Sequence, residues 1–238
     1  MSEKPFHFKQ FSVEQDKCAM KIGTDGVLLG AWVNLPKNIE SILDIGAGTG
    51  LLALQMAQRS DAELIDALEV EDAAYEQAVE NFEDSPWADR LFCYHASLQN
   101  FVLEIDDQYD FILCNPPYYT DTFKVLNPKR AIARHTSDLS FDTLLQSTSK
   151  LMKKDGQCAF IIPFKEESGF IKIAETFELN PIRITRVRGN LNSPLKRSLV
   201  QFSKQLNTPV INELTIETER HQYTEDYKRL VKDFYLEM

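Results

Sequence analysis

Short apolar runs alternate with amphipathic stretches along most of this chain, which is the pattern of buried strands connected by helices. Apolar runs predict strands at residues 41–45, 64–69, 91–94, 109–114 and 158–163. Helical spacing of apolar residues predicts helices over 51–57, 72–82, 139–152 and 168–177. The segment 99–107 is expected to be an acidic connection into the strand at 109–114. This regular order predicts an α/β fold, an open sheet with helices on both faces.

Both ends of the chain add elements to this core. Residues 6–11 alternate aromatic and polar positions, which predicts a short edge strand. The apolar run 27–33 predicts a helix capped by Thr24 or Asp25; its free amide groups could hold a carboxylate, or the cap could be an ordinary one. Towards the C-terminus, 183–188 and 198–202 alternate like an antiparallel hairpin. A strand at 214–216 and an amphipathic helix over 224–235 close the chain.

Length and composition limit the class of protein. A chain of 238 residues, 43% of them hydrophobic, is expected to form one domain: an N-terminal strand and helix (1–36), a core (37–205) and a C-terminal strand and helix (206–238). The cysteines, at 18, 93, 114 and 158, stand singly, so neither a zinc site nor a disulfide framework is predicted. The chain begins without a signal-like segment and its apolar runs are too short to span a bilayer, so we expect a soluble cytoplasmic protein.

Charge is unevenly distributed. The net charge of −10 argues against a general nucleic-acid coat. Between residues 179 and 212, however, there is no Asp or Glu, and six basic residues give +6, so the remainder carries −16. This segment predicts a local basic face for a polyanion, although a merely solvated face remains the alternative.

A glycine-rich turn follows the first predicted core strand. Asp44 and Ile45 precede Gly46, Gly48 and Gly50, and glycines in this position let the backbone approach a ligand closely. The spacing GxGxG departs from the dinucleotide fingerprint GxGxxG. Glu69 ends the second strand 19 residues after Gly50, where a carboxylate can accept hydrogen bonds from ribose hydroxyls. These two signals alone are compatible with nicotinamide dehydrogenases and with methyltransferases.

The sequence Asn-Pro-Pro-Tyr at 115–118 decides between these classes. It follows the strand 109–114 and predicts a rigid turn at a carboxyl strand end, where open α/β sheets bind ligands. The Asn115 amide oxygen and the Pro116 carbonyl can both accept hydrogen bonds from one planar NH2 group, and the ring of Tyr118 offers a face for stacking. The turn therefore indicates a site that presents an exocyclic amine to an electrophile.

These residues resemble those of class I S-adenosylmethionine-dependent methyltransferases with a Rossmann-like fold, and more closely the bacterial tRNA1(Val) adenine N6-methyltransferase family. The closer resemblance rests on residues 8–11, 15–16, 18–21, 23–26, 28–32 and 233–236, and spans essentially the whole chain. It implies a mixed seven-stranded sheet with an antiparallel terminal hairpin. It also implies N6-methylation of the adenosine 3′ of a tRNA anticodon, with S-adenosylhomocysteine as the second product. One departure is Ser97, which stands where the family usually has Asp near the cofactor's adenine.

The resemblance and the residue types together assign the site. We expect Asn115, Pro116 and Tyr118 to be catalytic. The expected cofactor-binding residues are Lys21, Thr24, Asp44, Gly46, Gly48, Gly50, Glu69 and Ser97. The expected RNA-binding residues are Tyr119, Lys129, Arg130, Arg134, Arg186 and Arg188. No metal is expected, and we expect a monomer.

Two other classes remain open at this point. The Asn-Pro-Pro-Tyr turn also occurs in methyltransferases of DNA adenine, of rRNA bases and of glutamine in release factors, whose side-chain amide presents a similar NH2 group. The basic segments argue against a protein substrate, which gives no reason for that charge. A nucleotide-binding module that uses only the glycine loop is the non-enzymatic alternative.

Overall fold

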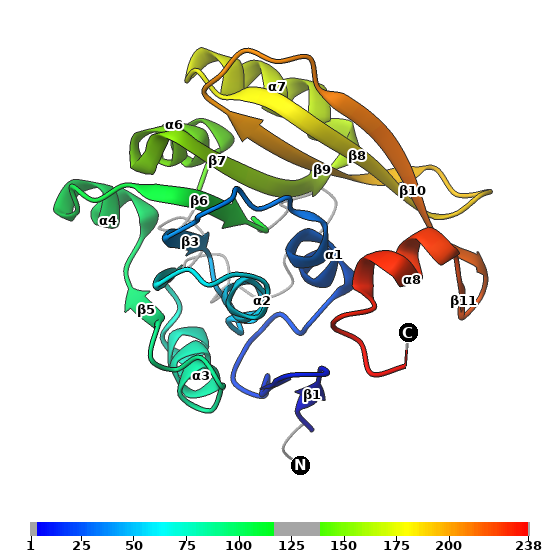
Figure 1. Cartoon of the computed structure of the whole chain (residues 1–238), viewed down its shortest axis with the longest axis horizontal. Helices are drawn as coiled ribbons and strands as arrows, with labels where there is room; N and C mark the ends of the chain where they lie inside the picture. Colours follow the sequence, from blue (N-terminus) through cyan, green and yellow to red (C-terminus); the bar gives the residue numbers. More distant parts are fainter. Residues whose placement is uncertain (1–3, 117–138, 238) are drawn as a thin grey trace, which may run out of the picture.

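The computed structural model describes residues 4–116 and 139–237, and in them one large sheet organises the chain. Its strand order is β11-β10-β8-β9-β7-β6-β3-β4-β5 (Figure 1). The parallel part consists of β3 (Ser41–Ile45), β4 (Leu64–Glu69), β5 (Leu91–His95), β6 (Tyr109–Cys114) and β7 (Met152–Pro163). Their carboxyl ends therefore lie along one edge.

The rest of the sheet is mixed. Strand β9 (Leu195–Ser203) runs antiparallel to both β7 and β8 (Asn180–Asn190), which confirms the expected terminal hairpin. Strand β10 (Val210–Glu219) lies parallel to β8, and β11 (Gln222–Tyr223) returns antiparallel to β10. The described sheet has nine strands where seven were expected, because β10 and β11 extend it beyond the hairpin.

Helices cover both faces of the sheet (Figure 1). One face carries α1 (Thr24–Trp32), α2 (Leu51–Arg59), α3 (Asp72–Glu83) and α8 (Glu225–Val231). The other carries α4 (Leu98–Glu104), α6 (Phe141–Leu151) and α7 (Glu167–Thr176), and α7 follows the short 3-10 helix η1 (Phe164–Glu166). Each face has its own apolar core, with Phe111 in the first and Phe160 in the second, and both of these rings are fully buried.

Four details differ from the expectations. Helix α4 replaces part of the acidic connection, and Ser97 caps it by accepting from the Asn100 amide. Helix α1 begins after Gly23 without a side-chain cap, so the expected Thr24 or Asp25 cap is wrong. Residues 6–11 do not add an edge strand to the core: β1 (Phe6–His7) and β2 (Ser12–Val13) form a separate two-stranded sheet. Helix α8 spans only part of the expected 224–235.

No helix in residues 4–116 and 139–237 is long and apolar enough to cross a membrane.

Candidate active site

Three of the expected site residues lie at the carboxyl ends of three neighbouring strands. Ile45 of β3 pairs with Leu68 of β4 and with Cys114 of β6. Gly46, Glu69 and Asn115 are the next residues on these strands, so they stand side by side at one edge, roughly 5 Å apart from strand to strand. The register therefore brings together the glycine turn, the carboxylate and the Asn-Pro turn that the sequence places in separate segments.

The glycine turn is an unusual piece of backbone. Gly46, Gly48 and Gly50 all have positive φ, at +79°, +55° and +80°. The amides of Gly46 and Ala47 both donate to the Leu68 carbonyl, at 2.9 and 2.8 Å, which folds the turn back over β4. A side chain at Gly46 or Gly48 would meet nothing within 4 Å, so both face open space, whereas one at Gly50 would lie 2.5 Å from the Phe82 ring. Gly46 and Gly48 therefore leave room for a ligand, and Gly50 leaves room for a helix.

Glu69 holds this turn in place. One carboxylate oxygen accepts the Gly48 amide at 2.8 Å, and the other accepts the amides of Val70 and Glu71 at 2.8 and 3.0 Å. A carboxylate has about four acceptor positions, so capacity remains for a hydroxyl donor. Glu69 therefore fixes the glycine turn in addition to any contact with a ribose.

Asp44 lies beneath the turn and is fully buried. One of its oxygens accepts the Ala53 amide at 3.2 Å, and the other, Oδ1, has no partner among the described residues. Burial raises the pKa of Asp44 to about 7, against the lowering effect of the Ala53 hydrogen bond. An unsatisfied buried carboxylate oxygen is costly, so a donor supplied by a ligand would stabilise it.

Asn81 is a site residue that the sequence did not reveal. Its side chain, on α3, is buried; it donates to the carbonyls of Thr49 and Glu14 and accepts the Glu14 amide. Gln77, one turn earlier, accepts the Lys17 amide. The sequence did carry one signal for this role: Gln77 and Asn81, at i and i+4, put two side-chain amides on the apolar face of a predicted helix. Asn81 ties the glycine turn to the N-terminal segment.

This N-terminal segment lies close to Glu69. Cys18 is buried there, and its pKa is raised to about 11, first by burial and then by the nearby charges of Glu69 and Glu71. Lys21 belongs to the same neighbourhood, and its ammonium donates to the Gln15 carbonyl at 2.5 Å. The structure thus places Lys21 beside the site.

Two other expected cofactor-binding residues, Thr24 and Ser97, lie at the starts of helices α1 and α4. Thr24 is exposed in the first turn of α1, and the neighbouring Asp25 forms an ion pair with Arg197 of β9 at 2.7 Å. Ser97 follows β5 two residues after His95, which pairs with Glu69 across the sheet. Its hydroxyl caps α4 at 3.2 Å from the Asn100 amide and keeps its own hydrogen for donation.

The Asn-Pro turn is described only at its start. Asn115 is half-buried and Pro116 is buried, directly after the fully buried end of β6. The rest of the turn, Pro117 and the expected catalytic residue Tyr118, lies outside the described residues. The same holds for four of the expected RNA-binding residues: Tyr119, Lys129, Arg130 and Arg134.

The expected basic face is largely neutralised in space. Arg186 forms a fork of hydrogen bonds with the buried carboxylate of Glu167, at 2.7 to 3.1 Å, and Arg188 pairs with Glu213. Arg183 lies on the opposite face, over the Trp32 ring at 4.4 Å. The acids come from outside the stretch 179–212, so a count along the sequence could not reveal them. Carboxylates thus offset three of the six charges counted along the sequence, which does not decide whether Arg186 and Arg188 touch RNA.

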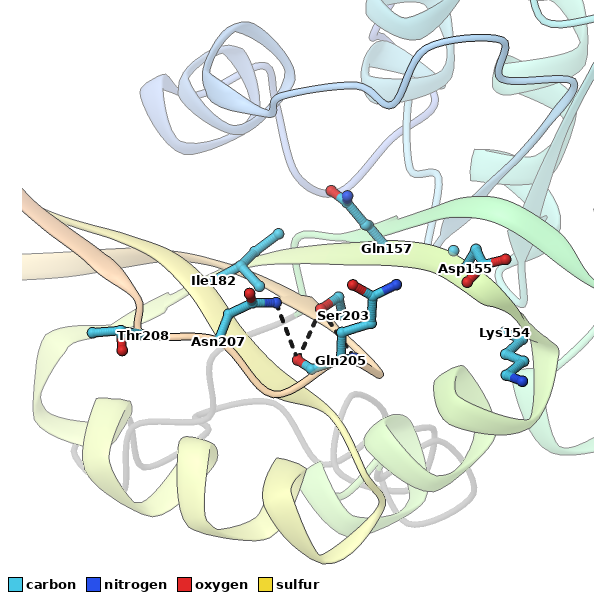
Figure 2. Close-up of a pocket in the computed structure, with 9 residues that line it drawn as sticks. Lys154, Asp155, Gln157, Ile182, Ser203, Gln205, Asn207 and Thr208 are labelled. Atoms are coloured by element: carbon cyan, nitrogen blue, oxygen red, sulfur yellow. Dashed lines mark hydrogen bonds between the residues drawn. The ribbon is translucent and has the colours of Figure 1, made fainter.

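A polar pocket of about 300 Å³ lies away from this edge (Figure 2). It is lined by the start of β7, Ile182 of β8 and the segment after β9. Ser203 and Asn207 both donate to the Gln205 carbonyl across it. These bonds belong to the turn itself, and the pocket lies at the amino end of β7, so it does not take part in the candidate site.

Known proteins share sequence similarity with this chain. A family profile described as methyltransferase small domain matches residues 26–163, which include the glycine turn, Glu69 and Asn115. A curated protein from Christiangramia forsetii named tRNA1(Val) (adenine(37)-N6)-methyltransferase is 56% identical over 240 residues, covering 100% of both chains. Proteins of the same name from Flavobacterium psychrophilum and Parabacteroides distasonis are 54% and 43% identical, covering 98% and 100% of this chain and 100% of each relative.

Solved structures show the same fold at low identity. A predicted O-methyltransferase from Agrobacterium tumefaciens has a TM-score of 0.69 at 21% identity, covering 88% of this chain and 96% of that one. TYW2 from M. jannaschii, solved in complex with AdoMet, has a TM-score of 0.55 at 13% identity, covering 84% and 85%. These likenesses establish a class I methyltransferase fold.

Proposed function

This chain belongs to the tRNA1(Val) (adenine(37)-N6)-methyltransferase family, and from that premise we propose that it transfers a methyl group from S-adenosylmethionine to N6 of an adenosine in tRNA, at position 37 beside the anticodon. The observation that carries the proposal is the register, which sets Asn115 and Glu69 on the two strands that flank the glycine turn. This arrangement sets an acceptor for an amine next to a nucleoside-binding edge.

The described residues fit the proposed methyl donor. Open space beside Gly46 and Gly48 admits the ligand to the backbone, and Glu69 retains acceptor capacity for ribose hydroxyls. Oδ1 of Asp44, which has no partner within residues 4–116 and 139–237, matches a need for a donor such as an ammonium group. When bound, S-adenosylmethionine supplies an electrophilic methyl group on a sulfonium sulfur.

The residues of the Asn-Pro turn orient the amine. The adenine N6 lone pair is delocalised into the ring, so the amine is a weak nucleophile. Two acceptors, the Asn115 amide oxygen and the Pro116 carbonyl, would hold both N–H groups and favour a pyramidal nitrogen with its lone pair directed at the donor. We propose Tyr118, outside the described residues, as the stacking partner of the base.

No strong base is required at this site. The methylated amine is acidic enough to lose its proton to water or to a nearby acceptor after transfer. Catalysis therefore consists mainly of orientation, which is the effect that positioned acceptors supply. Among the described residues, no group of His, Cys, Asp and Glu is arranged to hold a metal ion.

The proposed RNA surface begins at this edge. Its proposed parts are Tyr119, Lys129, Arg130 and Arg134, which lie outside the described residues, together with Arg186 and Arg188. We further propose that a single domain, a monomer, carries the whole site and that the protein works in the cytoplasm, where its tRNA substrate is processed.

The experiment that tests this function combines transfer and identification. The purified protein, labelled S-adenosylmethionine and unmodified valine tRNA should give label in tRNA, and nucleoside mass spectrometry should identify N6-methyladenosine. The same tRNA with guanosine at position 37 is the matched control and should remain unlabelled. Label in a release factor or rRNA instead, with none in tRNA, would contradict the proposal.

A further inference from the structure

A second hollow of about 600 Å³ lies close to the candidate active site and has a different character. It is enclosed by the start of α1, Gly189 of β8, the end of β10, β11 and the C-terminal helix region. In Figure 1 the labels of β10, β11 and α8 meet at this side of the molecule. Phe6, Tyr223, Tyr227 and Tyr235 line it. This concentration of aromatic rings in one hollow is not used by the methyl-transfer site.

The rings form two neighbouring pairs. Tyr223 and Tyr227 have centroids 5.2 Å apart with planes tilted by 32°, and Phe6 meets Tyr235 edge-on at 6.1 Å. Tyr227 is 2% exposed, so it forms the base of the hollow. Phe6, Tyr223 and Tyr235 are only partly buried. The arrangement thus has a fixed base and aromatic walls with accessible surface.

Helix α1 connects the hollow to the cofactor edge. Gly23 and Thr24 line the hollow, and Gly26 packs so closely on Leu51 that an added Cβ would lie 3.0 Å from that side chain. Leu51 is the residue directly after the glycine turn. The first turn of α1 therefore lines the hollow at Gly23 and Thr24 and packs at Gly26 against the first residue of α2.

One acidic group gives the hollow a polar preference. Glu217 of β10 lines it, and one of its oxygens accepts the His221 amide at 3.2 Å. A carboxylate that accepts a single amide can also accept from an N–H2 group of a base. An apolar peptide side chain would shield the remaining acceptor positions of this carboxylate from water without supplying a donor to them, which is unfavourable.

We propose that the aromatic hollow holds an unpaired nucleobase bearing an exocyclic amine, from the same RNA whose adenosine is methylated at Asn115. This inference rests on the proposed function and adds a second base-binding site to it. Single-stranded RNA loops are recognised through unstacked bases placed against aromatic side chains, which is the chemistry that Tyr223 and Tyr235 offer. The second site would select a loop by a base other than the target adenosine.

Paired variants at Tyr223 test the stacking. Tyr223→Leu keeps an apolar side chain but removes the flat ring, and we expect the Kd for an anticodon stem-loop RNA to rise about 5- to 150-fold, the range for one base stacked on an aromatic ring. Tyr223→Phe keeps the ring and should bind nearly as tightly as the wild type. The Kd for S-adenosylmethionine should be unchanged in both. Phe92→Leu, at an exposed ring on β5 on the far edge of the sheet, is the matched control and should leave the RNA Kd unaltered.

Abasic substitution identifies the base. Each loop nucleotide of the stem-loop other than the target adenosine is replaced in turn by an abasic one, and its effect is measured with wild-type protein and with Tyr223→Leu. At one position, whose base carries an amine, the two losses should be non-additive, because either change alone removes the same stacking contact. The same position should lose part of its preference for an amine-bearing base in Glu217→Ala.

The outcomes separate this inference from the proposed function. If wild-type protein methylates the tRNA while Tyr223→Leu binds RNA with unchanged affinity, the second base site is wrong and the function stands. Lower thermal stability of Tyr223→Leu with unchanged RNA affinity also overturns the second base site, since the hollow is then internal packing. Additive losses at every loop position likewise contradict the inference. Absence of any RNA methylation by wild-type protein contradicts the proposed function itself.

Discussion

Asn115 and Asp44 illustrate how single side chains carry the chemistry at this edge. Asn115 follows a strand end that is completely buried, and the following Pro116 fixes its backbone, so little conformational freedom remains to be lost when a base is bound. Asp44 is buried with one oxygen that has no partner in the described part of the chain. We therefore propose that Asn115 is preorganised for the substrate and that a bound ligand supplies the donor that Asp44 lacks among the described residues.

Replacing Asn115 by Ala should separate catalysis from binding. We expect kcat for methyl transfer to fall by at least about 100-fold, the scale for removing one positioned hydrogen-bonding group. The Kd for S-adenosylmethionine and the thermal midpoint should change little. Asn212→Ala, on the exposed part of β10, is the control and should retain full activity. A kcat for Asn115→Ala close to that of the wild type would show that Asn115 is only a turn residue.

Asp44 should make stability depend on pH. Because burial raises its folded-state pKa to about 7, the unfolded chain loses this proton first as the pH rises above about 4. The free energy of unfolding should therefore fall between about pH 4 and pH 7 and level off above pH 7, by up to roughly 4 kcal/mol. Asp44→Asn should lack this component.

Urea unfolding at pH 5 and pH 8 measures the effect. The difference in the free energy of unfolding between Asp44→Asn and the wild type should shift by roughly 2 to 3 kcal/mol in favour of the variant from pH 5 to pH 8. This shift is expected even if the substitution changes stability by a constant amount at both pH values. Equal differences at the two pH values would show that Asp44 is already ionised in the folded protein at pH 5. Because Asp44→Asn also loses a charge that could face an ammonium group, we expect weaker S-adenosylmethionine binding in the same variant.

At the scale of elements, the sequence predicted the strands and helices better than the polar contacts that connect them. The parallel strands, the hairpin and helices α2, α3, α6 and α7 follow from apolar periodicity, because burial on two faces or on one stripe leaves that signal. Asn81 could not be recognised as the link between α3, the glycine turn and the N-terminal segment, since its partners are backbone carbonyls 32 and 67 residues away. Long-range polar contacts of this kind leave no local pattern.

Substitution by Ala should change stability in opposite directions at Gly50, in the glycine turn, and at a glycine inside a helix. Gly50→Ala combines a φ of +80° with a Cβ 2.5 Å from the Phe82 ring, so we expect it to lower the free energy of unfolding by roughly 2 to 4 kcal/mol. Gly169, inside α7, has nothing within 4 Å of an added Cβ. Gly169→Ala should instead raise stability by about 0.5 to 1 kcal/mol.

Denaturant unfolding of both glycine variants provides the measurement. If Gly50→Ala proved as stable as the wild type, the packing of the turn against α3 would be wrong. Phe82→Leu should recover part of the loss in the double variant, because a smaller side chain makes room for the methyl group.

At the scale of the whole molecule, charge is the property that the sequence described least well. Five of the six basic residues between 179 and 212 have a partner within the described part of the chain: Arg183, Arg186, Arg188, Arg197 and Lys204. Three of these partners are carboxylates from other segments: Glu167 of α7, Asp25 of α1 and Glu213 of β10. They come close to the arginines only when α7, α1 and β10 pack against β8 and β9. A run of like charge in sequence is therefore poor evidence for a free field until the fold is known.

Two neutralising substitutions can separate structural arginines from RNA contacts. Arg186→Gln leaves the buried Glu167 carboxylate without its charged partner, with Ser198 as its one remaining donor among the described residues, so we expect a loss of about 2 to 3 kcal/mol in stability. Lys196, in the same hairpin, is exposed. Lys196→Gln should leave stability unchanged.

RNA binding measured against salt then shows which of the two residues meets phosphate. Each contact contributes roughly 0.7 to 0.9 to the slope of log affinity against log salt, so Lys196→Gln should flatten the slope by that amount if the hairpin faces RNA. Arg186→Gln should change the slope by less, because its charge is already compensated by Glu167. If neither substitution alters the slope while wild-type binding depends steeply on salt, the hairpin is a solvated face, and the phosphates must be met by the basic residues between Lys124 and Arg134.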